Sequence, residues 1–171
     1  MWPHYTAYLL SFLVVGVIWL NHHAVVQCLT RTNHAVQILN LLLLLSVSIL
    51  PWPTAVLSDY LREGTRADQR VTVALYGVSL SLMGVAFTIF WRYVFRHHEL
   101  HRPDLDRKVL VVRHRRNIVG LVAYPLVTAL GLLSAPLFIA LILALVVVFL
   151  WPTPDLRRGS VQRDPHGEDQ D

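Results

Sequence analysis

Charge is scarce in this chain and is absent from the cores of its long apolar runs. Lys, Arg, Asp and Glu make up 15% of the 171 residues, whereas 54% are hydrophobic and the mean hydropathy is +0.48. Soluble domains carry about 25% charged residues, so the composition predicts an integral membrane protein. Cysteine is equally scarce. Because Cys28 is the only one, an internal disulfide framework and any multi-cysteine metal site are excluded.

Basic residues are missing before the first apolar run. Residues 1–5 lack the positive region of a secretory signal peptide, and no small-residue cleavage site follows the run. The isoelectric point near 9.6 does not indicate nucleic-acid binding, because the Lys and Arg residues flank apolar runs. The positive-inside rule already explains them there.

Five apolar runs predict an all-α bundle of five membrane-spanning helices within residues 1–151. The expected spans are about 5–28, 36–57, 71–95, 117–133 and 136–151. The last two are short and are separated only by Ser134, Ala135 and Pro136, so one re-entrant unit is an alternative to two spans. Residues 152–171 are polar and rich in Pro, Asp and Arg, which predicts a disordered cytoplasmic tail.

The distribution of Lys and Arg predicts the orientation of these spans. With five spans, twelve basic residues fall on one side of the membrane and three, Arg62, Arg66 and Arg70, on the other. The richer side is expected to be cytoplasmic, which places the C-terminus inside and Met1 outside. A short N-terminal segment without basic residues is unusual on the outer side of the membrane when no helix precedes it to set the orientation. We therefore hypothesise one further helix upstream, which an intact native mass of 19.5 kDa would contradict.

The sequence lacks the residues that several kinds of transport and redox site require. Buried carboxylates for proton coupling are absent from the span cores, and so is the T-V-G-Y-G filter of one potassium-channel design. Two histidine groups, 22–34 and 97–101, invite a metal hypothesis. Their spacing does not match H-E-x-x-H, and membrane di-iron sites need a larger set of histidines. We expect boundary polar residues, with no metal and no cofactor.

Polar and small side chains form stripes on three spans. In the first span Tyr8, Ser11, Val15, Trp19 and His22 lie within about 80° of one another on a helix, so this stripe is expected to face protein. Asn40, one turn into the second span, needs a partner across helices. In the third span Gly77, Ser81, Gly84 and Thr88 recur every three or four residues and predict a close-packing face.

Several of these residues together resemble a known family. The series resembles bacterial relatives of the lysosomal potassium channel called transmembrane protein 175, and it consists of Tyr8, Ser11-Phe12, Trp19, Asn21-His22-His23, Asn40 and Pro51-Trp52-Pro53-Thr54. The match covers about residues 1–57 with specific residues and the rest by the number and spacing of spans. The family's R-x-x-x-F-S-D motif, carried by its first helix, is absent from the 171 residues.

The resemblance implies a potassium-permeable channel subunit that assembles as a homotetramer in the bacterial inner membrane and needs no cofactor beyond the permeant ion. It also implies that Trp19, His22 and Asn40 belong to a structural polar network. Residues 51–54 (Pro51, Trp52, Pro53 and Thr54) are expected to break the second span near the outer interface. The pore-lining residues stay unknown. The alternative is a non-conducting membrane scaffold or a truncated remnant of such a channel.

Overall fold

The computed structural model describes residues 2–103 and 107–151, with side chains undescribed at a few of these positions. Its helices are α1 (Trp2–Val26), α2 (His34–Ile49), α3 (Pro51–Glu63), α4 (Arg66–Arg96), α5 (Arg107–Gly131) and α6 (Ala135–Leu150), with a short 3-10 helix, η1 (His98–Leu100). The expected all-α helical fold is confirmed. The expected tail, 152–171, lies outside the described residues.

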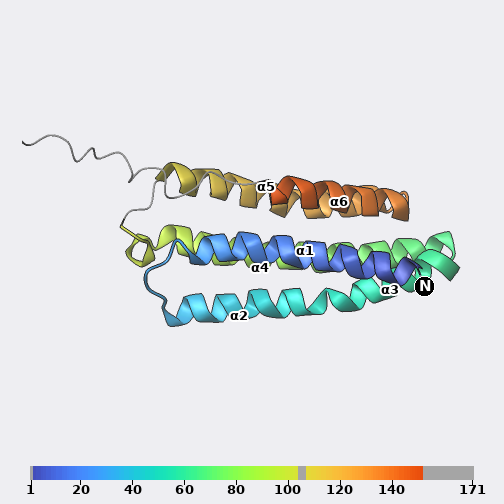
Figure 1. Cartoon of the computed structure of the whole chain (residues 1–171), viewed down its shortest axis with the longest axis horizontal. Helices are drawn as coiled ribbons and strands as arrows, with labels where there is room; N and C mark the ends of the chain where they lie inside the picture. Colours follow the sequence, from blue (N-terminus) through green and yellow to red (C-terminus); the bar gives the residue numbers. More distant parts are fainter. Residues whose placement is uncertain (1, 104–106, 152–171) are drawn as a thin grey trace, which may run out of the picture.

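The helices run roughly parallel to one long axis (Figure 1). Helices α2 and α3 follow one another along one side of the bundle, and α5 and α6 form a hairpin on the other side. Helix α4 is central, because it packs against α2, α3, α5 and α6. The α1–α2 and α4–α5 connections lie at one end of the bundle, which we call the basic end. The N-terminus and the α3–α4 and α5–α6 turns lie at the opposite end.

Helix bounds differ from the expected spans in two places. Helix α5 begins at Arg107, ten residues before the expected start, because the Arg-rich segment before the apolar run is itself helical. The second expected span is divided between α2 and α3. Among the described residues, three stretches are long and apolar enough to cross a membrane, Tyr8–Val26, His34–Leu61 and Arg66–Arg96, and α6 is a shorter apolar helix. The count of five spans stays a prediction.

Local capping explains where two helices begin. Asn33 precedes α2, and its side-chain oxygen accepts from the backbone N–H of Val36 at 2.9 Å. Thr65 precedes α4 and forms a capping box with Asp68, whose carboxylate accepts from the Thr65 backbone N–H at 2.9 Å. These side chains satisfy N–H groups that the first turn of a helix leaves without partners.

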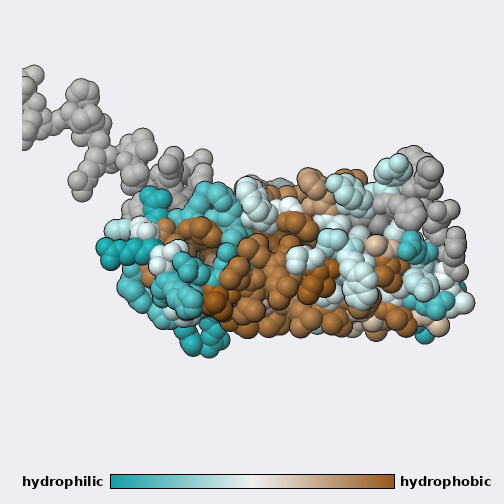
Figure 2. All heavy atoms as spheres, turned by 90° about the horizontal axis from the view of Figure 1, so that it is seen from below, coloured by the Kyte–Doolittle hydropathy of each residue, from teal (hydrophilic) through white to brown (hydrophobic). Residues whose placement is uncertain are grey.

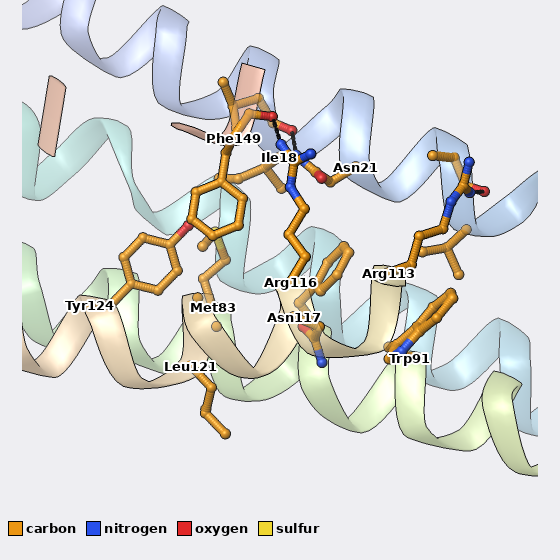
Figure 3. A pocket seen from close by; sticks show the side chains of 16 residues that line it. Ile18, Asn21, Met83, Trp91, Arg113, Arg116, Asn117, Leu121, Tyr124 and Phe149 are labelled. Atoms are coloured by element: carbon orange, nitrogen blue, oxygen red, sulfur yellow. Dashed lines mark hydrogen bonds between the residues drawn. The ribbon is translucent and has the colours of Figure 1, made fainter. Parts of the chain in front are cut away.

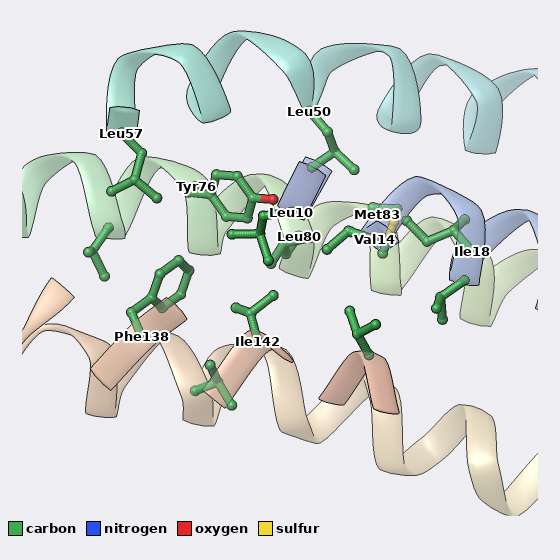
Figure 4. Packing of buried hydrophobic residues seen from close by; sticks show 14 of the residues in the cluster. Leu10, Val14, Ile18, Leu50, Leu57, Tyr76, Leu80, Met83, Phe138 and Ile142 are labelled. Carbon is green, nitrogen blue, oxygen red and sulfur yellow. The ribbon is translucent and has the colours of Figure 1, made fainter. Parts of the chain in front are cut away.

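The core consists of two apolar clusters. The larger one joins α1, α2, α3, α4, α5 and α6, and Figure 4 shows its side chains meeting between the helices. Within it, the ring of Tyr76 on α4 meets Phe138 on α6 edge to face, with centroids 5.7 Å apart. The second cluster lies toward the basic end, around Phe90, Trp91 and Val94 of α4. On the face seen in Figure 2, apolar side chains cover much of the middle of the surface, and polar ones gather at the basic end.

The expected close-packing face on α4 is confirmed. A Cβ placed on Gly77 would lie 2.1 Å from Thr128 Oγ1 of α5, and one on Gly84 would lie 2.9 Å from the Tyr124 ring. Farther along the same side, the Thr88 hydroxyl donates to Asn117 Oδ1 at 3.4 Å. Only residues without a side chain allow α4 and α5 to approach this closely.

Candidate functional site

His22 and Asn40 form a polar contact between α1 and α2. His22 Nε2 lies 2.8 Å from Asn40 Oδ1, a hydrogen bond that forms when Nε2 carries the ring proton. Both side chains are half-buried. The ring of Phe90 on α4 covers the imidazole at 5.5 Å between centroids. The contact therefore supplies Asn40 with the partner that a polar residue in an apolar helix requires.

Trp19 lies outside this contact. Its side chain is 59% exposed and stacks on the His23 ring, with centroids 5.1 Å apart and planes 10° apart. Tyr8 and Phe12, earlier on α1, are also exposed, whereas Ser11 and His22 are half-buried. Within one subunit, the two aromatic residues of the stripe that was expected to face protein, Tyr8 and Trp19, are therefore exposed. The role of Trp19 in a polar network stays a prediction.

Substitution tests the coupling between His22 and Asn40. Each change to alanine leaves its partner half-buried without a hydrogen bond, whereas the double change removes both groups. We expect a double-mutant cycle of H22A and N40A, measured by unfolding in detergent, to give a coupling of about 0.5–1.5 kcal/mol. His23→Ala is the matched control, because His23 is exposed and takes no part in the contact: it meets Gln27, just after the end of α1, and the ring of Trp19. Additive losses would contradict a direct contact.

The chain breaks its helix at Pro51. Helix α2 ends at Ile49 and α3 begins at Pro51, and the backbone N–H of Leu50 donates to Val47 at 3.1 Å, a tighter i→i−3 turn. A proline lacks the N–H that would continue the ladder. Thr54, which is buried, donates its hydroxyl to the Leu50 carbonyl at 2.7 Å. Thr54 thus ties the first turn of α3 to Leu50, the residue between the two helices.

The other residues of this segment lie on different sides. Pro53 is buried in the core, and Trp52 is 61% exposed on the outer surface. An exposed Trp near a helix end suits the boundary between lipid and water. Its place at the outer interface stays a prediction.

Two arginines of α5, which lie before the expected start of the fourth span, reach the ends of other helices. Arg113 Nη1 donates to the Ala24 carbonyl near the end of α1 and lies 3.6 Å from Cys28 Sγ. Burial raises the pKa of the Cys28 thiol, which follows the end of α1, and Arg113 opposes that shift. Arg116 donates to the carbonyls of Val148, Phe149 and Trp151 at the end of α6.

Cations suit these positions, because the last carbonyls of a helix carry partial negative charge. The spacing of the two arginines is the sequence signal from which their common role could have been predicted. Residues three apart share one side of a helix, and both stand directly before the apolar half of α5.

The two arginines line a pocket between α1, α4, α5 and α6 (Figure 3). Its wall includes Asn21 and Asn117 near the arginines. The Nδ2 group of Asn21 donates to the Val17 carbonyl at 2.7 Å. Asn117 accepts from Thr88, whereas its Nδ2 group is buried and has no partner among the described residues. This pocket was not predicted from the sequence.

The histidines of the α4–α5 connection have other partners. A ring nitrogen of His97 lies 2.9 Å from the Tyr93 carbonyl, and one of His101 lies 2.8 Å from the Val94 carbonyl. His114 of α5 accepts from the indole N–H of Trp91 at 3.2 Å. Across the described part of the chain, no three His, Cys, Asp or Glu side chains gather closely enough to hold a metal ion.

Several known proteins are similar to this chain in sequence. A model of the family described as endosomal/lysosomal potassium channel TMEM175 matches residues 1–51. A protein of Streptomyces collinus named as a potassium channel is 41% identical over 139 residues, which are 81% of this chain and 66% of that relative. One of Chamaesiphon minutus, also named as a potassium channel, is 30% identical over 149 residues, 87% of this chain and 72% of the relative.

A solved structure has a similar fold. The crystal structure of a lysosomal potassium-selective channel TMEM175 homolog from Chamaesiphon minutus superimposes with a TM-score of 0.74 at 28% identity. The match covers 86% of this chain and 72% of that one. The similarity therefore extends well beyond the residues matched by the family model.

Proposed function

Because this chain belongs to the TMEM175 family of potassium channels, we propose that it is a subunit through which potassium ions cross the bacterial plasma membrane passively. The observation that carries the proposal is the 149-residue match to the Chamaesiphon potassium channel. The span cores, free of Asp, Glu, Lys and Arg, suit passive conduction, because coupled transport usually uses buried charges. The family consists of ion channels rather than enzymes. Conduction in this account needs no cofactor.

In the proposed orientation the basic end faces the cytoplasm. Arg31 lies in the α1–α2 connection, Arg92 and Arg96 lie in the last turns of α4, and Arg102 lies in the α4–α5 connection. These elements meet at the basic end, and α6 runs toward it, which supports a cytoplasmic C-terminus. Positive residues on cytoplasmic connections are the usual determinant of orientation. The opposite end, with the α3–α4 turn, then faces outward together with the bend at Pro51 and the exposed Trp52.

The proposed assembly is a homotetramer in the bilayer. The exposed aromatic side chains of α1, Tyr8, Phe12 and Trp19, support it, because a neighbouring subunit would cover them. In this assembly the His22–Asn40 contact fixes α1 against α2 and so sets the direction in which Trp19 points.

Potassium flux from loaded vesicles tests this function. We expect vesicles containing the 171-residue chain to release potassium faster than protein-free vesicles, and H22A to reduce the release. If the chain were silent while a version extended by a family-type first helix conducted, it would be a remnant of a channel. Silence from both forms would contradict the channel proposal and favour a membrane scaffold.

A further inference from the structure

The pocket between α1, α4, α5 and α6 has a polar half and an apolar half. Its volume is about 70 Å³, which is room for several water molecules or one small polar group. Toward the basic end its wall carries Asn21, Arg113, Arg116 and Asn117. Deeper along the same helices the wall is apolar, and Figure 3 shows Met83, Leu121, Tyr124 and Phe149 on that side of Arg116.

Among the residues that the structure describes, the polar half carries positive charge without a matching negative one. None of the described residues that line the pocket is acidic. The described partners of Arg113 and Arg116 are neutral, since they are backbone carbonyls and the Cys28 sulfur. A partly buried cation is costly unless an anion compensates it. The pocket therefore favours an occupant with negative charge.

Within residues 2–103 and 107–151, three N–H groups in this half have no hydrogen-bond partner. They are Nε of Arg113, Nε of Arg116 and Nδ2 of Asn117, and each is buried. Buried donors without partners cost free energy. The phosphodiester of a lipid brings two non-bridging oxygens and one negative charge, and guanidinium groups bind such oxygens in strong, charge-assisted hydrogen bonds.

We propose that this pocket binds the phosphate of an anionic lipid. The phosphate lies against Arg113, Arg116 and Asn117, and an acyl chain follows the apolar wall at Met83 and Leu121. The basic end is where anionic headgroups meet a membrane protein, and basic pockets between membrane helices are suited to them. Free phosphate would satisfy the same donors and leave the apolar half uncovered. The site does not depend on ion conduction.

Thermal unfolding in a zwitterionic detergent tests the proposal with three added probes: phosphatidylglycerol, phosphatidylcholine and inorganic phosphate. We expect phosphatidylglycerol to raise the melting temperature of the full chain and phosphatidylcholine at equal concentration to leave it unchanged. Arg113→Gln should weaken the affinity for phosphatidylglycerol about tenfold or more, because one charge-assisted contact is lost. Arg115→Gln is the matched control, since Arg115 is the exposed neighbour on the same helix. It should stay within about twofold of the unchanged protein.

Equal losses of affinity for phosphatidylglycerol in Arg113→Gln and Arg115→Gln would overturn the proposed site, because they would show that surface charge alone attracts the lipid. Stabilisation by inorganic phosphate as large as that by phosphatidylglycerol would overturn the lipid assignment and leave an anion site for free phosphate. Circular dichroism spectra of each variant without lipid establish that the helices are intact.

Asn117→Asp is a second variant that tests the same site without removing a contact. The carboxylate has nearly the shape of the amide, keeps an oxygen toward Thr88 and supplies the missing negative charge. We expect this variant to melt at or above the temperature of the unchanged protein and to lose its response to phosphatidylglycerol. An unchanged response would overturn the proposal.

Discussion

Replacing Gly77 by alanine is expected to lower the free energy of unfolding by about 1–3 kcal/mol. The added methyl group would lie 2.1 Å from Thr128 Oγ1, 2.3 Å from its Cγ2 and 2.6 Å from its Cβ. These atoms sit on α5 next to its backbone, so α4 and α5 must move apart to admit the methyl group. Unfolding in detergent with increasing SDS, followed by circular dichroism, measures the change.

The two matched variants separate packing from helix propensity. Gly16 on α1 has no atom within 4 Å of an added Cβ, so Gly16→Ala should be neutral or stabilising, because alanine favours a helix over glycine. Thr128→Gly removes the three atoms nearest to the Gly77 methyl group, so the double variant should recover part of the loss. If G77A proved as stable as Gly16→Ala, α4 and α5 would not pack as closely as described.

Replacing Arg116 by methionine is expected to destabilise the end of α6. Its guanidinium donates to the carbonyls of Val148, Phe149 and Trp151 and lies over the Phe149 ring, 5.2 Å from the centroid. Methionine keeps much of the apolar stem and removes the charge and the donors. We expect a loss of about 2 kcal/mol in detergent without anionic lipid. Hydrogen exchange of the α6 amides should rise in the last turn of the helix and stay unchanged in its first.

Arg115→Met is the control for this change, because Arg115 is exposed and one position removed on the same helix. Surface arginines contribute little to stability, so its unfolding and α6 exchange should match those of the unchanged protein. Equal effects of the two substitutions would contradict the assignment of Arg116 as the residue that caps α6.

Local signals in the sequence were sufficient to predict the helices and some of the contacts between them. The apolar runs predicted the all-α membrane bundle, and the glycine spacing on the third span predicted the face that packs on α5. The prolines at 51 and 53 marked the place where α2 ends and α3 begins, because proline cannot donate to the ladder. Asn40, as an isolated polar residue in an apolar run, was expected to need a partner, and His22 lies within hydrogen-bond distance.

Contacts that several helices build together could not be predicted in this way. Arg113 and Arg116 were counted with the basic connecting segment, since hydropathy alone does not show that α5 begins at Arg107. Their partners come from α1 and α6, which are distant in sequence. Trp19 illustrates the reverse case. It shares a helical stripe with His22, yet its ring stacks on His23, because residues four apart on a helix are neighbours.

Current through a planar bilayer tests the central claim, that this chain forms a potassium-permeable channel, most directly. With potassium as the only cation, a large impermeant anion and a tenfold concentration gradient, the account predicts currents that reverse near the potassium equilibrium potential. That potential is about 60 mV from zero, because a tenfold gradient is about 1.4 kcal/mol and 100 mV is about 2.3 kcal/mol per charge. Bilayers that contain the folded protein and carry no more current than protein-free bilayers would contradict it.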